Sequence, residues 1–151
     1  MTTLNFAAQV DGWAKKAKAR LEAVFQTSAE RVSEAVQNGT PIDTGFLVHS
    51  WAASAGGMPK IIAGSRPPSS AGKASYKFDA GPINLIISNV PLGGTVYFGF
   101  TAGYAPHVEY GANGRAGRAM VRLAAQRWPQ IVKEAVSEAK ARVGKGSGRT
   151  P

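Results

Sequence analysis

The sequence of 151 residues contains no cysteine, which excludes a disulfide framework, a zinc site built on thiolates and a cysteine nucleophile. It has only two histidines, His49 and His107, so metal or acid–base chemistry has few candidate groups. Acidic residues are also scarce: 9 Asp and Glu stand against 18 Lys and Arg, which gives a net charge of +9. This excess indicates an acidic partner, either nucleic acid or an acidic surface of another protein.

The sequence also lacks any apolar run that approaches the length of a membrane span. Its first residues, Met-Thr-Thr-Leu-Asn-Phe, lack the basic and apolar regions of a signal peptide, so we expect a cytosolic product with no membrane partner. The length fits a single domain, which we place over residues 1–143. Residues 144–151 contain several glycines with Lys and Arg and predict a flexible basic tail.

Two long helices are predicted by apolar residues that recur at three- and four-residue steps. The first covers residues 4–38 and at ~1.5 Å per residue would be roughly 50 Å long. That length exceeds what a core of this size can cover, so part of the helix should project, bend at Gly12 or lie against another subunit. The second covers residues 118–143, where Pro129 removes a backbone hydrogen bond and predicts a kink near Trp128.

The middle of the chain begins with a short predicted helix. Asp43 is placed to cap a helix over residues 44–50, which leads into an extended segment at residues 51–54. A long segment rich in Pro and Gly follows, residues 56–82, with one short predicted strand at residues 60–63. Loops of this length are uncommon in a compact domain, so we expect this segment to become ordered only against a neighbour.

A β-hairpin is predicted next. Residues 83–90 are rich in β-branched side chains, residues 91–94 form a turn, and apolar residues alternate along residues 95–101. Gly99 lies on the face opposite the apolar one and indicates a close approach or a bend in the strand.

Residues 104–111 join this hairpin to the last helix. Pro106 and Gly111 delimit one helical turn, which Gly111 can end in the left-handed αL conformation, at positive φ. Glu109 stands among aromatic residues and needs a partner if it is covered. Together the elements predict an α+β fold with a long N-terminal helix, an antiparallel sheet of about four strands, and a kinked C-terminal helix packed on the sheet.

Few residues support catalysis or metal binding. His107 and Glu109 would offer two metal ligands if their segment were extended, but nothing nearby completes a set of three or four. Ser50, His107 and Asp43 supply the residue types of a catalytic triad without the Gly-x-Ser-x-Gly turn that exposes a nucleophile. The Gly-rich segment 111–117 lacks the Gly-Lys-Ser/Thr ending of a phosphate loop, although an anion could sit near Arg115 and Arg118. We therefore expect no enzymatic activity, cofactor or metal.

Several basic residues are candidates for an interface. Arg66 and Lys73 stand among small residues of the long loop, and Arg115, Arg118 and Arg122 follow the last helical turn. No helix-turn-helix, zinc finger or RNA-recognition signature accompanies them. These residues either face solvent or another subunit, or they contact the phosphates of a nucleic acid without reading its sequence.

Two motifs flank the predicted sheet. Pro41-Ile-Asp-Thr-Gly45, followed by Leu47 and Ser50, closes the first helix, and Tyr104-Ala105 with Val108-Glu109-Tyr110-Gly111 precedes the last one. This pair, in this order, resembles the neck or tail-completion family of long-tailed bacteriophages, the gene-10-product-like minor tail components that are similar in role to lambda gpZ. The resemblance covers most of the chain, and its signature residues are Asp43, Thr44, Gly45, Leu47, Tyr104, Ala105, Glu109 and Gly111.

The resemblance implies a structural virion protein, made in the bacterial cytoplasm, that helps to join tail to head at the neck. It implies self-association into a ring, expected to be a hexamer, and contacts with neighbouring neck, tail-terminator or tail-tube proteins. It implies no catalysis. The Pro- and Gly-rich segment 56–82 and the high basic charge depart from the family pattern. The charge leaves a second hypothesis open, a basic DNA-binding accessory protein without sequence preference, and any contact with the genome would be through its phosphates.

Overall fold

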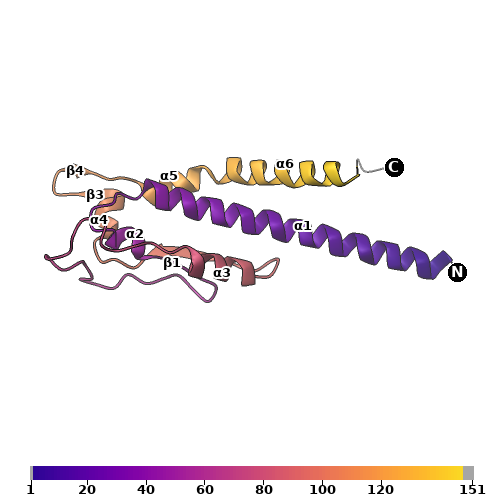
Figure 1. Cartoon of the computed structure of the whole chain (residues 1–151), viewed down its shortest axis with the longest axis horizontal. Helices are drawn as coiled ribbons and strands as arrows, with labels where there is room; N and C mark the ends of the chain where they lie inside the picture. Colours follow the sequence, from indigo (N-terminus) through magenta and orange to yellow (C-terminus); the bar gives the residue numbers. More distant parts are fainter. Residues whose placement is uncertain (1, 148–151) are drawn as a thin grey trace.

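The computed structural model describes residues 2–147 of the chain, and it has an α+β fold. The longest element is the helix α1, Thr2–Gly39, which runs through the middle of the molecule (Figure 1). The helices α5, Met120–Gln126, and α6, Trp128–Ser147, lie along one side of it, and the helix α2, Phe46–His49, the strand β1, Trp51–Ser54, and the helix α3, Gly81–Asn89, lie on the other. The first and last described residues therefore lie at the same end.

The molecule has two parts, which we call the head and the arm. The head contains every element from α2 to α5 together with the C-terminal third of α1, and the arm consists of the remaining length of α1 with α6 antiparallel beside it (Figure 1). α1 is one unbroken helix, so it projects as predicted and does not bend at Gly12. Its outer half leaves Phe6 67% and Trp13 70% exposed.

The predicted kink near Trp128 is confirmed. α5 ends at Gln126 and α6 begins at Trp128, with Arg127 between them donating its N–H to the carbonyl of Ala124 at 3.0 Å. Pro129 stands in the first turn of α6, where its missing N–H costs no intrahelical hydrogen bond. The main neighbour of α6 is α1, so the prediction that the C-terminal helix packs on the sheet is wrong. α6 also contains residues 144–147 of the predicted tail, and residues 148–151 lie outside the described part.

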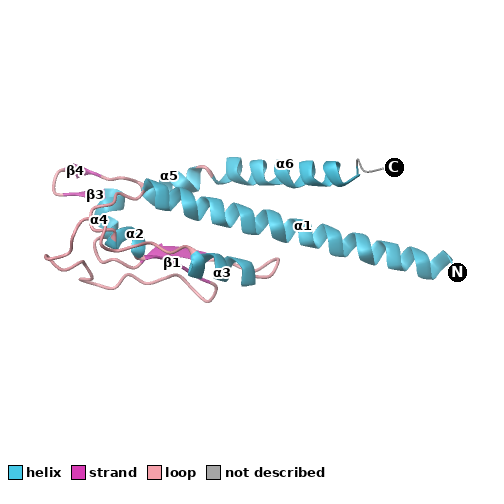
Figure 2. Cartoon of the chain, viewed as in Figure 1, coloured by secondary structure: helices cyan, strands magenta, loops and turns pink. Residues whose placement is uncertain are grey.

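The predicted four-stranded sheet is replaced by two small antiparallel pairs (Figure 2). β1 pairs with β2, Tyr97–Phe100, with Trp51 opposite Phe100. The second pair joins β3, Gly111–Ala112, to β4, Arg115–Ala116. Residues 60–63 are not a strand, because only one backbone hydrogen bond, from Ile62 to the carbonyl of Thr101 at 2.9 Å, links them to the end of β2.

The predicted strand over residues 83–90 is wrong, since this segment is the helix α3. Its β-branched residues favoured a strand, but Ile83 and Ile87 are four residues apart, and both are buried in the core. Pro82 stands at the start of α3, where proline is well tolerated. The predicted hairpin therefore does not form, and β2 takes β1 as its partner instead.

The short helix after the first motif is confirmed as α2, but its predicted cap is wrong. Asp43 is exposed, and the residue before α2 is Gly45, at φ 86°, with no side-chain cap of its own. The hydroxyl of Thr44 accepts a hydrogen bond from the N–H of Phe46 at 3.2 Å. A side chain at Gly45 would collide with the carbonyl of Tyr76, so glycine is required there both for its conformation and for space.

The core lies where α1 meets the head. Trp51 is 4% exposed, stacks on Phe98 with ring centroids 5.7 Å apart, and donates its indole N–H to the hydroxyl of Ser33 at 2.8 Å. This hydrogen bond ties β1 to α1 across the core. The other buried members of the cluster are Ala29, Val36, Leu47, Ile83, Ile87, Phe100, Ala102, Ala105, Met120 and Ala124.

The long segment between β1 and α3 forms neither helix nor strand. It is tied to its own chain, because Ala74 donates its N–H to the carbonyl of Asp43 at 2.7 Å and Tyr76 donates to Thr44 at 2.9 Å. Met58 and Pro59 pack over Gly99, which confirms the close approach predicted at that glycine. The structure thus places this segment without a neighbour, whereas the sequence led us to expect order only against one.

Candidate functional site

The two sequence motifs, about sixty residues apart, meet in the head. The ring of Phe46 stacks on Tyr104 with centroids 6.2 Å apart, and Leu47 and Ala105 belong to the same buried cluster. Burial, with a smaller contribution from the charge of Asp43, raises the pKa of Tyr104. These contacts join the segment after α1 to the start of the helix α4, Ala105–Tyr110, and we call this region, with α4, the joint.

Glu109 is the polar centre of this joint. Its side chain accepts hydrogen bonds from the N–H of Val121 at 3.0 Å, the N–H of Arg122 at 3.1 Å and Nε of Arg122 at 3.0 Å. The first two are unpaired donors of the first turn of α5, so a carboxylate on α4 acts as a helix cap. Arg122 also donates to the carbonyl of Glu109 at 2.7 Å and lies over the ring of Tyr110, 4.6 Å from its centre. The prediction that Glu109 needs a partner is confirmed.

The electrostatics of Glu109 follow from these contacts. The residue is 7% exposed, and this burial by itself would raise the pKa of the carboxyl. The two backbone N–H groups and the hydrogen bond and charge of Arg122 outweigh burial and lower the pKa below its ordinary value. Glu109 is therefore ionised at neutral pH and stabilises the junction of α4 and α5 as an anion.

Gly111 ends α4 and starts β3. Its φ is +93°, so the predicted positive φ is confirmed, but its ψ of 155° lies outside the αL region that we expected. A Cβ at this position would lie 2.6 Å from the carbonyl oxygen of Arg115 and 2.8 Å from the N of Gly117. Glycine is therefore required both by the backbone conformation and by the close approach of β4.

The segment after Gly111 is a β-hairpin with a two-residue turn. Asn113 and Gly114, at φ 53° and 77°, form its turn between β3 and β4. An Asn-Gly pair with positive φ at both residues is the commonest turn of a tight β-hairpin. The Asn-Gly pair is therefore the sequence signal that indicates the hairpin, which our predictions did not include.

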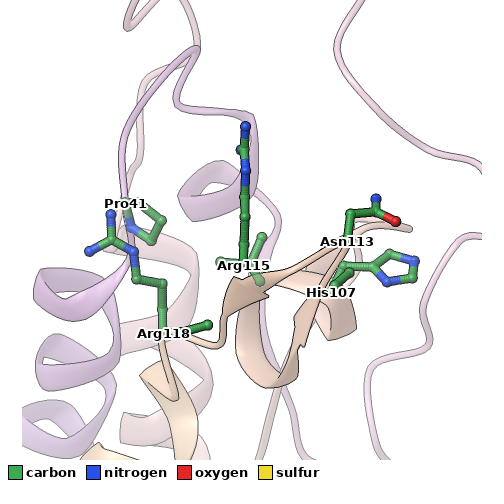
Figure 3. Close-up of a pocket in the computed structure, with 8 residues that line it drawn as sticks. Pro41, His107, Asn113, Arg115 and Arg118 are labelled. Carbon is green, nitrogen blue, oxygen red and sulfur yellow. The ribbon is translucent and has the colours of Figure 1, made fainter.

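A hollow of about 820 Å³ opens beside this hairpin, and its ionisable lining residues are His107, Arg115 and Arg118. Pro41 of the first motif also lines it. In Figure 3 the side chains of Arg115 and Arg118 extend in the same direction, while the ring of His107 points away from them. A second hollow, of about 730 Å³, adjoins the first at His107 and contains Arg66.

The five basic residues singled out in the sequence are thus divided by the structure. Arg115, Arg118 and Arg66 gather at the end of the head, with His107 between them. Lys73 lines neither hollow. Arg122 is half exposed but engaged with Glu109 and Tyr110, so it serves the joint rather than an open surface. The sequence suggested His107 only as a metal ligand or a catalytic base. No local sequence pattern indicates that it lines both hollows.

The groups considered for catalysis in the sequence are engaged in other contacts or lie apart in the described residues. The hydroxyl of Ser50 donates to the carbonyl of Leu47 at 2.7 Å, within its own helix end. No hydrogen bond among the described side chains joins Ser50, His107 and Asp43. Both oxygens of Glu109 are occupied by Val121 and Arg122, and the described residues contain no group of three or more possible metal ligands.

The arm carries a second surface feature, an apolar groove of about 430 Å³ between α1 and α6. Trp13, Leu21 and Val24 of α1 line it, opposite Val136 and Val143 of α6. Among its lining residues the ionisable ones, Arg20 and Lys140, are both basic. Trp13 and Leu21 are 70% and 57% exposed, so within the described chain this groove is uncovered.

Comparisons of this chain with protein-family models, with curated proteins and with solved structures found no match. Within residues 2–147, no helix combines the length and the apolar character needed to cross a membrane.

Proposed function

We propose that this chain is a structural virion protein that self-associates into a ring at the head–tail junction of a long-tailed bacteriophage, helping to join tail to head. The proposal rests first on the motif pair that resembles the neck or tail-completion family. The meeting of these motifs in one joint, through Phe46 and Tyr104, supports treating them as a single structural unit. The proposal includes no catalytic role.

The observation that carries the proposal is the uncovered apolar stripe of the arm. Phe6, Val10, Trp13 and Leu21 recur along α1 and are between 48% and 70% exposed. Burial of one such side chain is favourable by about 1.5–3 kcal/mol, so this stripe is a strong contact surface. A helix that projects beyond its own core in this way fits an assembly in which a neighbour supplies the missing cover.

Charge along the arm favours another copy of the chain as that neighbour. Lys16, Lys18 and Arg20 lie on the outer part of α1, whereas Glu30 and Glu34 lie on its inner part and are exposed. Two copies in the same register would set like charges against each other. A copy displaced along the arm would set the basic part of one against the acidic part of the next. This is a head-to-tail contact, which gives a ring when the rotation between neighbouring copies closes.

Sedimentation velocity of the purified chain, with negative-stain microscopy, tests the assembly. We expect closed rings, and we expect Trp13→Ser with Leu21→Ser to give monomers that keep the helical circular-dichroism spectrum of the wild type but melt below it, because assembly stabilises the folded chain. The matched control is Ile61→Ser with Ile62→Ser, which removes two exposed apolar side chains from the head. A wild-type chain that stays monomeric at millimolar concentration would overturn the ring.

The position in the virion needs a separate test. Gold-labelled antibody against the chain, applied to long-tailed particles from the culture that produces it, should mark the neck or the head-proximal end of the tail. Labelling confined to the capsid surface, or absence of the chain from purified particles, would contradict the proposed location even if the chain forms rings.

A further inference from the structure

The end of the head concentrates positive charge from two separate segments. Arg66 belongs to the long segment after β1, Arg115 and Arg118 belong to the hairpin and the residues that follow it, and His107 of α4 lies where the two meet. They line two adjoining hollows, and no Asp or Glu lines either one. Distant parts of the sequence therefore fold to place like charges together, although this arrangement is repulsive in isolation.

These guanidinium groups have no acidic partner among the described side chains. The ion pairs found there are Lys15 with Asp11, Arg31 with Glu138, and Arg122 with Glu109. Arg66, Arg115 and Arg118 are exposed and take part in none of them. Their hydrogen-bond donors are therefore available to an anion from outside the chain.

The backbone under two of these residues is fixed. The turn at Asn113 and Gly114 holds Arg115 in β4, paired with Ala112. Arg118 donates its N–H to the carbonyl of Val108 at 2.7 Å, which anchors it to α4. Fixed attachment points lower the entropic cost of binding, so the site is prepared for a ligand rather than formed by it.

We propose that this basic end, defined by Arg66, His107, Arg115 and Arg118, binds the phosphate backbone of double-stranded DNA. Guanidinium groups bind phosphate oxygens in pairs of hydrogen bonds, and such contacts carry no sequence information. Nucleic-acid interfaces are polar and positive, as this surface is. An acidic protein is a poorer fit, because protein interfaces centre on buried aromatic or aliphatic anchors and no exposed large apolar side chain lines either hollow.

This site is distinct from the ring proposed above and does not depend on it. The apolar stripe lies on the arm, whereas the basic end lies at the far end of the head (Figure 1). A monomeric chain would retain the whole site, so the two proposals fail separately. In a ring, the same site would bring the genome to one defined end of each copy.

Fluorescence anisotropy with a short labelled duplex tests the site over a salt series from roughly 50 to 200 mM. The wild-type chain should bind unrelated duplex sequences equally, with affinity falling steeply as salt rises. Arg115→Ala with Arg118→Ala should weaken binding about tenfold or more and reduce the log–log salt slope by about 2, since two phosphate contacts are lost. Arg115→Lys with Arg118→Lys should keep the slope.

The matched control is Lys16→Ala with Lys18→Ala, which removes the same charge from the arm and should change binding little. Equal losses in both double variants would overturn the site, because net charge alone would then explain binding. A wild-type chain that fails to bind at low salt, or that prefers one sequence more than tenfold, would also overturn it. The site would also be overturned if polyglutamate displaced the labelled duplex as effectively, per unit of charge, as unlabelled DNA does. Thermal melting checks that each variant is folded.

Discussion

Two tryptophans in this chain have opposite environments, and they separate the head from the arm. Trp51 is buried, stacked on Phe98 and hydrogen-bonded to Ser33. Trp13, the same type of side chain, is 70% exposed on a helix that projects beyond the core. The head thus has a buried core of its own, whereas the outer part of the arm presents an apolar stripe that the described chain does not cover.

Truncating each tryptophan in turn is the most sensitive test of this difference. Trp51→Ala should destabilise the folded chain by about 3–5 kcal/mol, through lost burial, lost stacking and the lost hydrogen bond to Ser33. Trp13→Ala, measured on the monomer, should change stability by no more than about 0.5 kcal/mol, because little of that side chain is buried. Guanidinium unfolding followed by circular dichroism measures both. Similar losses for the two variants would show that the arm is part of the same cooperative core.

Gly111→Val should destabilise the head by roughly 2–4 kcal/mol. A β-branched residue is strained at φ +93°, and its Cβ would press on the backbone of Arg115 and Gly117. Gly12→Val, in the outer part of α1 with nothing within 4 Å of an added Cβ, is the matched control. Thermal melting of the two variants should differ clearly, and equal melting temperatures would contradict the strain assigned to Gly111.

Glu109→Gln should destabilise by about 1.5–3 kcal/mol at pH 7, because the amide places N–H groups among the donors of α5 and Arg122. The pKa of Glu109 is lowered in the folded state, so its contribution is fully present above the unfolded value and is lost as pH falls through the folded value. The stability gap between wild type and Glu109→Gln should therefore narrow as pH falls below about 4.5. Urea unfolding at a series of pH values measures it, and a gap that widens on acidification would contradict the assignment.

The smallest effects are expected at the start of α2. Thr44→Ala removes one hydrogen bond to the N–H of Phe46 and should cost about 0.5–1 kcal/mol. Asp43→Ala should cost less than about 0.5 kcal/mol, because the exposed carboxylate makes no cap. Differential scanning calorimetry can separate the two. A larger loss of stability in Asp43→Ala than in Thr44→Ala would show that Asp43 does cap α2, as its position in the sequence suggests.

The sequence predicted the parts of the fold that depend on local patterns. The apolar period marks α1 and α6, Pro129 marks the interruption before α6, and Gly111 marks the end of α4. Each of these signals acts within a few residues of where it stands, so no knowledge of the tertiary structure is needed. The turn at Asn113 and Gly114 is equally local, and it could have been predicted in the same way.

The predictions that were wrong concern elements whose structure depends on tertiary contacts. α3 is rich in isoleucine, which favours strands, but the core accepts Ile83 and Ile87 from one helical face. Asp43 has the right spacing for a cap. The residue that precedes α2 is instead Gly45, in a left-handed conformation, which has no side chain to cap the helix. The cap of α5 is Glu109, twelve residues before Val121, and no local pattern connects them.

The candidate site shows the same division. The sequence identified Arg66, Arg115 and Arg118 by residue type, but it could not show that the segment carrying Arg66 returns to His107, which also lines the hollow beside the hairpin. The sequence also could not distinguish Arg122, which is hydrogen-bonded to Glu109, from the arginines whose guanidinium groups have no acidic partner among the described side chains. Charge counts are a property of composition, whereas the gathering of charges is a property of the fold.

The exposed Trp13 gives the chain a built-in optical reporter. The chain has three tryptophans, and Trp51 is already shielded from water while Trp128 is 38% exposed. Replacing Trp128 with phenylalanine would leave the shielded indole of Trp51 and the hydrated indole of Trp13. A change in fluorescence emission wavelength, with the fold unchanged, would then report on Trp13 and hence on the arm. Contact formation along α1 could then be followed in real time, without attaching a dye.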